Sequence, residues 1–155
     1  MYSEFAPFSL KNNTLFSEEF DDLYSSAKGA VAECNHVFIK GNNLNERFEN
    51  LGENSKFYIG EIGFGIGINF LTTCKSWLDH TKQNQVLEFY SFDKYLFRLS
   101  DFKTLNVSCP DLKEYISELE RNYPRNIQGA QKISLFGGRI IPVSYTHLRA
   151  HETEE

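Results

Sequence analysis

The stretch Glu61-Ile62-Gly63-Phe64-Gly65-Ile66-Gly67-Ile68-Asn69-Phe70 decides the fold of this chain. A short apolar run bounded by glycines, Lys56 to Glu61, leads into it and is typical of a buried parallel strand. Beyond it, apolar residues recur at Ile68, Leu71 and Trp77 with polar residues between them, which favours an amphipathic helix. A strand, a glycine-rich turn and a helix in this order indicate the opening of a Rossmann-like α/β unit.

The glycine-rich turn predicts a ligand site. Gly63, Gly65 and Gly67 allow positive φ and remove Cβ atoms from the approach path of a ligand, and the following helix offers unpaired N–H groups. In a dinucleotide fold the pattern GxGxxG holds a pyrophosphate. Here the pattern is GxGxG, and Glu61 stands two residues before the first glycine. An acid there repels pyrophosphate and suits the cationic amino-acid end and sulfonium of S-adenosylmethionine (SAM).

Asp93 supplies the second part of the predicted site. It ends the next predicted strand, Leu87 to Asp93, where a carboxylate can accept both ribose hydroxyls of an adenosine group. It lies about thirty residues after the first glycine, whereas dinucleotide sites have roughly 20. A polar loop, His80 to Gln85, accounts for the difference. A lone GxGxG turn is weak evidence, and the flanking strand, helix and acids strengthen it.

Composition narrows the class of protein. A chain of 155 residues accommodates one domain, and a net charge of −5 argues against a general nucleic-acid coat protein while leaving room for a local basic patch. Cys34, Cys74 and Cys109 lack metal-ligand spacing, so we expect reduced, buried thiols and no metal. The sequence has no apolar run of about 18 residues and no signal peptide at its start, so we expect no membrane association and a cytoplasmic location.

The sequence divides into three parts. Residues 1–55 form a β-rich lead-in with a turn at Asn12-Asn13-Thr14, a strand over 36–40 and helical turns over 44–48. Residues 56–142 form the first half of a Rossmann-like domain, with later helices over 101–105 and 111–123 and a hairpin over 133–141. Residues 143–155 look like a translated sequencing adapter. We therefore interpret them as a non-native tail, and we do not interpret His147 and His151 as a metal pair.

Several blocks carry a resemblance to a known family. They are Phe20 to Tyr24, Gly41 to Phe48, Glu61 to Leu71 and Ser91 to Lys94. In register from Thr14 to Ile141, the chain resembles the methyltransferase domain of the bacterial tRNA 5-methylaminomethyl-2-thiouridine biosynthesis (bifunctional) family. Ile66 stands where that family usually has Thr, and Asp93 where it usually has Glu. The carboxylate is therefore kept with a shorter reach.

The resemblance implies a truncated SAM-dependent tRNA methyltransferase. It would methylate the aminomethyl group of 5-aminomethyl(-2-thio)uridine at wobble position 34, with tRNA as partner. FAD would be a cofactor only if a fused oxidoreductase domain exists. The implied cofactor-binding residues are Glu61, Gly63, Phe64, Gly65, Gly67, Asn69, Phe70, Asp93 and Lys94, while Asp22, Tyr24 and Asn42 would shape the cofactor mouth or substrate side. No catalytic residue is identified.

Two alternatives remain open at this point. A nucleotide-binding oxidoreductase would use the three glycines for NAD or FAD, and a degenerate methyltransferase fold would serve as a non-catalytic interaction module. Because a sheet cut after its early strands exposes apolar surface and a strand edge, we expect the 155-residue chain by itself to be unstable or inactive. The sequence does not determine the oligomeric state.

Overall fold

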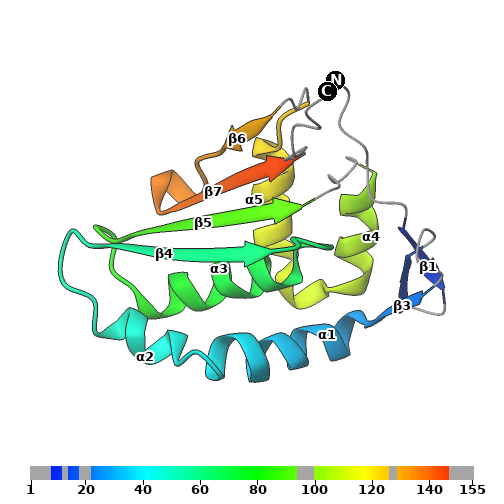
Figure 1. The fold of residues 1–155 in the computed structure, drawn as a ribbon, viewed down its shortest axis with the longest axis horizontal. Coiled ribbons are helices and arrows are strands. Elements are labelled where there is room, and N and C mark those ends of the chain that lie inside the picture. Colours follow the sequence, from blue (N-terminus) through cyan, green and yellow to red (C-terminus); the bar gives the residue numbers. More distant parts are fainter. Residues whose placement is uncertain (1–7, 12–13, 18–21, 94–99, 126–128, 147–155) are drawn as a thin grey trace, which may run out of the picture.

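The structure is a computed structural model that describes residues 8–11, 14–17, 22–93, 100–125 and 129–146 (Figure 1). A small antiparallel sheet contains β1 (Phe8–Lys11), β2 (Thr14–Ser17) and β3 (Asp22–Ser26) in that order. Lys11 pairs with Thr14, and residues 12–13 of the predicted turn lie outside the described ranges. The chain then becomes helical, and the main sheet begins at residue 56.

The main sheet has the order β4-β5-β7-β6. Its strands are β4 (Lys56–Ile62), β5 (Val86–Asp93), β6 (Ala130–Lys132) and β7 (Ile140–Thr146). β4, β5 and β7 are parallel, while β6 pairs antiparallel with β7 at one edge. This arrangement confirms the predicted α/β class. β7 runs across the predicted boundary between residues 142 and 143, and the origin of residues 143–155 stays a prediction.

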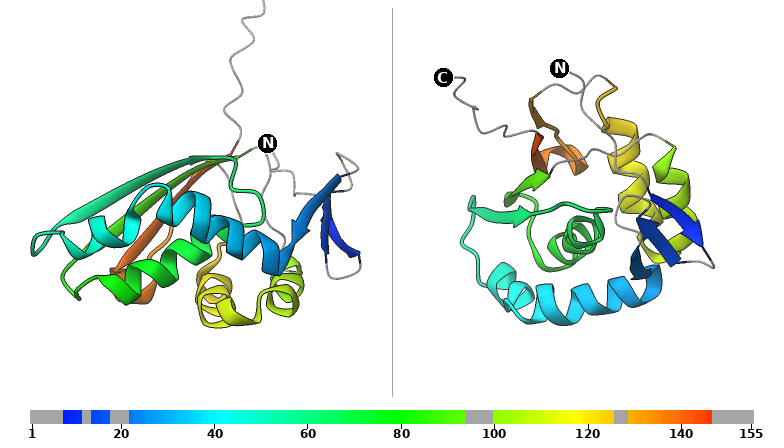
Figure 2. Two further views of the ribbon diagram at one scale, coloured as in Figure 1. Left: turned by 90° about the horizontal axis from the view of Figure 1, so that it is seen from below. Right: turned by 45° about the vertical axis from the view of Figure 1, so that its right-hand side comes forward.

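The helices lie together on one face of the main sheet (Figures 1 and 2). They are α1 (Ala27–Glu33), the π-helix η1 (Cys34–Lys40), α2 (Leu44–Glu49), α3 (Ile68–His80), α4 (Asp101–Ser108) and α5 (Lys113–Asn122), with single 3₁₀ turns η2 (Pro110–Leu112) and η3 (Phe136–Gly138). None of the helices within the described ranges is long and apolar enough to cross a membrane.

The core forms where α2 and α3 pack against β4 and β5. Trp77 is fully buried, and its ring lies 5.0 Å from that of Phe48, which in turn meets the ring of Phe57 edge to face. Two turns earlier on the same face of α3, Phe70 contacts Phe89 of β5 at 5.1 Å between ring centroids. The expectation that Trp77 belongs to the core is confirmed. All three cysteines are free and buried, as predicted.

The expected strand over residues 36–40 is wrong, because these residues lie in the π-helix η1. The sequence His36-Val37-Phe38-Ile39 has the β-branched and aromatic residues that favour a strand. In the structure Cys34 and Ile39 are buried while Val37 is exposed, which is a helical pattern of burial. Packing against α3 has therefore overridden local propensity, and the second half of the lead-in is helical.

Two other predicted elements are adjusted. The hairpin exists, but its pairing begins earlier, at Ala130, and its turn is a 3₁₀ turn that starts at Phe136. The helix predicted over 111–123 opens as the separate turn η2 after Pro110 and becomes α-helical from Lys113.

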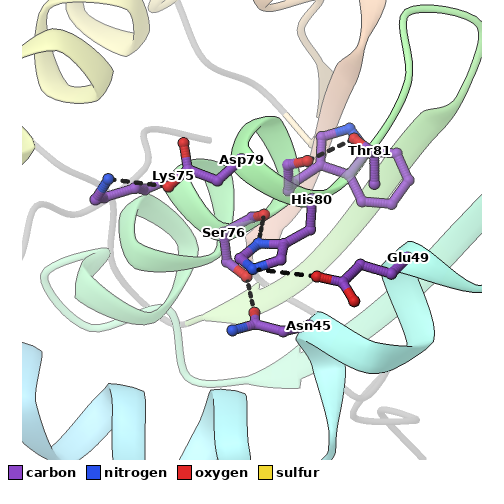
Figure 3. A network of polar contacts seen from close by, with 8 residues as sticks. Asn45, Glu49, Lys75, Ser76, Asp79, His80 and Thr81 are labelled. Carbon is purple, nitrogen blue, oxygen red and sulfur yellow. Dashed lines mark hydrogen bonds and ion pairs between the residues drawn. The ribbon is translucent and has the colours of Figure 1, made fainter.

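Polar contacts attach α2 to α3 (Figure 3). Ser76 donates its hydroxyl hydrogen to the Oδ1 of Asn45, and His80 Nδ1 donates to the carbonyl of Ser76 at 2.8 Å. His80 Nε2 lies 3.7 Å from a carboxylate oxygen of Glu49. Because the Ser76 hydroxyl points to Asn45 and not to the imidazole, this serine, histidine and glutamate do not form a nucleophilic triad. The cluster instead fixes α2, and hence the end of η1, against the core.

We predict that Gly41→Ala destabilises the fold. Gly41 follows the last residue of η1, and an added Cβ would lie well inside contact distance of the Val37 carbonyl oxygen. A backbone atom cannot move aside cheaply, so we expect a loss of about 1–3 kcal/mol in the free energy of unfolding, measured by urea denaturation. Gly60→Ala is the control, since no atom lies within 4 Å of its added Cβ. Equal effects of the two substitutions would contradict the prediction.

Candidate functional site at the glycine-rich turn

The turn between β4 and α3 depends on left-handed backbone at alternate positions. Gly63, Gly65 and Gly67 have φ of +83°, +57° and +79°. Side chains rarely tolerate this conformation, which explains the residue type at each position. An added Cβ at Gly63 or Gly65 would meet no atom within 4 Å, so these glycines face open space into which a ligand can approach.

Backbone and side-chain bonds tie this turn to the end of β5. The N–H of Gly63 donates to the carbonyl of Phe92 at 2.7 Å, which extends the pairing of the two strands. The N–H of Gly65 donates to Asp93 Oδ2 at 2.8 Å. The structure therefore brings Asp93 to the turn, as predicted from sequence, and shows that this carboxylate also holds the loop in place.

Glu61 lies beneath the turn as a buried acid. It is only 8% exposed, and its Oε1 accepts a hydrogen bond from the side-chain amide of Asn69 at 2.9 Å. Its Oε2 is buried and has no hydrogen-bond partner among the described residues. Glu61 does not line the cavity itself; its partner Asn69 does. The acid thus orients Asn69, and its second oxygen remains available for a donor.

Burial raises the pKa of Glu61 to about 7. The hydrogen bond from Asn69 opposes this shift, while the nearby carboxylate of Asp93 adds to it by charge repulsion. A positive charge placed near Glu61 would offset both the cost of burying the ionised carboxylate and its repulsion by Asp93. The site therefore favours a cationic or hydrogen-donating group over an anion.

A cavity of about 340 Å³ opens above the turn. One wall is formed by Gly63 to Ile66 with Ile68 and Asn69, and the other by residues of α1 and η1. Among the described lining residues Glu33 carries the only carboxylate, and none is Lys, Arg or His; those of the helical wall are Ala30, Glu33, Cys34, Val37 and Phe38.

Sequence reasoning missed this helical wall. It assigned residues 36–40 to a strand, so it did not bring Cys34 and Phe38 to the turn. The spacing of Ala30, Cys34 and Phe38 at intervals of four is the signal that was present in the sequence, because residues four apart share one face of a helix. Burial raises the pKa of the Cys34 thiol to about 11, so this wall presents a neutral thiol.

The predicted site residues differ in where they lie. Phe64 lines the cavity, whereas Gly67 is buried and its carbonyl accepts the first hydrogen bond of α3, from Leu71 at 2.9 Å. The ring of Phe70 is fully buried in the core between those of Phe64 and Phe89, and its part in cofactor binding stays a prediction. Phe70 supports the turn from below.

The remaining predicted residues either lie at a different cavity or have no described side chain. Asn42 donates its amide to the Phe38 carbonyl at 2.8 Å and lines a different cavity, beside β4. Asp22 and Tyr24 belong to β3, of which only the backbone is described, and Lys94 lies outside the described residues. Within the described ranges no group of three or more His, Cys, Asp or Glu side chains is arranged to hold a metal ion.

These features define a Rossmann-like α/β unit with a ligand cavity at the carboxyl end of its first parallel strand. Among solved structures, MnmC2 from Aquifex aeolicus has this fold, with a TM-score of 0.64 and 18% identity over 94% of this chain and 43% of that chain. No protein-family profile matches the chain.

The sequence relatives identify the family. The chain is 37% identical over 145 residues to the tRNA 5-methylaminomethyl-2-thiouridine biosynthesis bifunctional protein MnmC of Hydrogenovibrio crunogenus, and 40% identical over 127 residues to that of Marinobacter nauticus. These matches include 89% and 80% of this chain. The chain belongs to the MnmC family, as the sequence blocks predicted, and spans about a fifth of the length of these relatives.

We predict that Glu61→Gln stabilises the fold at alkaline pH. The pKa of this carboxyl is raised from 4.5 to about 7 in the folded chain, so ionising it in place costs free energy. That cost is absent below pH 4.5, grows as the pH rises and is complete above pH 7. At roughly 1.4 kcal/mol per pKa unit, Gln should add about 1–3 kcal/mol at pH 8 and little at pH 4.5.

Urea unfolding at the two pH values, followed by fluorescence of the single tryptophan, Trp77, measures this difference. Glu53→Gln, at an exposed loop position, is the matched control and should show no such pH dependence. Equal stabilisation by Glu61→Gln at both pH values would rule out ionisation as the cause.

Proposed function

We propose that the cavity at the glycine-rich turn binds SAM. We further propose that the MnmC-type protein to which this segment belongs methylates the aminomethyl group of 5-aminomethyl(-2-thio)uridine at wobble position 34 of tRNA. The observation that carries the proposal is the charge of the site. Glu61 and Asp93 lie at the turn, Glu33 lines the cavity, and none of the described lining residues is basic. A pyrophosphate would meet repulsion here, whereas a sulfonium with an ammonium group would be attracted.

Each part of SAM has a matching group in the site. Its carboxylate suits the N–H groups at the start of α3, a helix of 13 residues whose dipole is positive at that end. Its ammonium suits Asn69 and the unpaired oxygen of Glu61. The ribose hydroxyls suit the carboxylate of Asp93 at the end of β5. The predicted cofactor residues Gly63, Phe64 and Gly65 border the same space.

The reaction chemistry asks little of the protein beyond positioning. SAM supplies a methyl group on a sulfonium; the amine nitrogen forms a bond to that carbon as the carbon–sulfur bond breaks, and the amine then loses a proton. Only the neutral amine has the necessary lone pair. Holding the two reactants in line accounts for a large part of the rate increase in such reactions.

The names of the relatives support tRNA as the substrate, since both are tRNA 5-methylaminomethyl-2-thiouridine biosynthesis proteins. A cytoplasmic location follows from a tRNA substrate. The same names describe bifunctional proteins, and FAD belongs to this proposal only if the parent protein carries a fused oxidoreductase domain. We assign no general base, and we expect the 155-residue chain alone to be inactive.

We predict that SAM binding releases a proton. The test protein is a chimera in which this chain replaces the matching segment of the Hydrogenovibrio crunogenus MnmC protein. Because the pKa of Glu61 is about 7, a cationic ligand should drive off about half a proton per site at pH 7. Isothermal titration in two buffers of different ionisation enthalpy measures this number. The Glu61→Gln chimera should release almost none and bind SAM more weakly.

The same titrations decide between the alternatives. Binding of NAD or FAD at the turn in place of SAM would establish the oxidoreductase interpretation, with Gly65→Val as the variant that should block either ligand there. No binding of any of the three by the chimera would favour a non-catalytic module. Native-like SAM affinity in the 155-residue chain by itself would contradict the expectation that it is inactive.

A further inference from the structure

The helical wall of the cavity has an inner and an outer row of side chains. α1 and η1 run on as one helical segment past the carboxyl end of β4 (Figure 1). Ala30, Cys34 and Phe38 follow at intervals of four and form the inner row, in which Cys34 is only 4% exposed. Glu33 and Val37, also four apart, form the outer row, and both are exposed. The outer row therefore lies at the mouth of the cavity, opposite the glycine-rich turn.

Glu33 is the residue of the outer row that can bind a charged group. It carries the single carboxylate among the described lining residues, and its side chain makes no hydrogen bond or ion pair with a residue of the described ranges. The other side chains of the helical wall are apolar, apart from the Cys34 thiol, which burial keeps neutral. A carboxylate at the mouth of an otherwise uncharged wall attracts a cation.

The direction of methyl transfer assigns the two walls to different reactants. This step rests on the proposed function, in which SAM lies along the glycine-rich turn with its ammonium at Asn69 and Glu61 and its ribose at Asp93. Displacement at a methyl carbon is in line, so the attacking nitrogen must lie on the side of the methyl group away from the sulfur. Because the turn holds the cofactor, the acceptor amine approaches from the helical wall.

We propose that Glu33 binds the acceptor amine and thereby selects a nucleobase that carries an aminomethyl group. A primary alkylamine is protonated at neutral pH, as a lysine side chain is, so it enters the mouth as an ammonium and donates an N–H to the Glu33 carboxylate. Once the ammonium has lost one proton to water, the neutral amine keeps an N–H on Glu33 and its lone pair faces the methyl carbon.

The transfer step then consumes nothing from Glu33. The nitrogen–carbon bond forms as the carbon–sulfur bond breaks, and the electron pair of the broken bond stays on the sulfur. The product is a secondary ammonium, which gives its extra proton to water. Glu33 therefore acts as a substrate-binding carboxylate that fixes the direction of the lone pair, and not as the general base.

The same cavity offers aromatic surfaces to the base that carries this amine. Phe38 of the helical wall and Phe64 of the turn both line it, and both are partly buried. Bases of single-stranded loops are commonly turned outward and stacked on aromatic side chains. Stacking does not distinguish one uridine from another, because every base has a π-face. Recognition of the substituent therefore falls to Glu33.

Binding of tRNA to the chimera tests this role. Two tRNAs are compared without SAM, one with 5-aminomethyluridine and one with 5-hydroxymethyluridine at position 34, a group of similar size without charge. We expect the unaltered chimera to prefer the amine. Glu33→Gln should lower the ratio of the two dissociation constants about tenfold, as expected for the loss of one charge-assisted hydrogen bond. Glu33→Asp keeps the charge and should retain most of the preference.

The matched control is Glu46→Gln, at an exposed position of α2 that does not line this cavity, and it should leave the ratio unchanged. Misfolding of part of a sample lowers the amount of tRNA bound but not the ratio of the two constants. An unchanged ratio in Glu33→Gln, or an unaltered chimera that does not prefer the amine, would overturn the proposal.

Titration with SAM separates this proposal from the proposed function. Because charge at an exposed rim is screened by solvent, Glu33→Gln should bind SAM within about threefold of the unaltered chimera. A loss of SAM affinity as large as the loss of amine preference would assign Glu33 to the cofactor and overturn the proposal. The tRNA comparison uses no SAM, so its failure is distinguishable from failure of SAM to bind.

Discussion

The left-handed turn between β4 and α3 is the constraint on which the rest of the site depends. Its three glycines reverse the chain within a few residues, so that the start of α3 comes directly above the end of β4. The bonds from the turn to Phe92 and Asp93 then fix the end of β5 in the same place. Backbone N–H groups thus link the end of β4 and the start of α3 to the end of β5 and Asp93. The conformation of this one turn therefore defines the floor of the cavity.

Charge and burial give this floor its chemical character. Glu61 is held beneath the turn with one oxygen bonded to Asn69 and the other without a partner among the described residues. A buried carboxyl in that state has a raised pKa and gains most from a nearby cation. The stability of the fold and the affinity for a cationic ligand therefore pull in opposite directions at this residue, as is common where a site has been kept for binding.

The two faces of the main sheet differ in how they are covered beside the turn. α1 and η1 close one side of the cavity, and the contacts of Asn45 and Glu49 with α3 hold the following helix in place (Figure 3). On the opposite face of the sheet Ile62 and Phe92 stay exposed beside the same turn. The cavity thus lies beside one face of the sheet that helices cover and one face that no helix of the described ranges covers (Figure 2).

The sequence by itself determined the parts that depend on local conformation. Short apolar runs, glycine spacing and helical periodicity predicted β4, the turn, α3 and β5, because residue type restricts φ and burial directly. The sequence blocks around them predicted the MnmC family. Only the tertiary structure decided that residues 34–40 form a helix, that Phe70 packs in the core, and that Asn42 lies at another cavity. Each of these depends on which surfaces meet across the fold. Packing on α3 outweighs the strand propensity of Val37 and Ile39, and the sequence alone could not decide between that propensity and the helical spacing of the same segment.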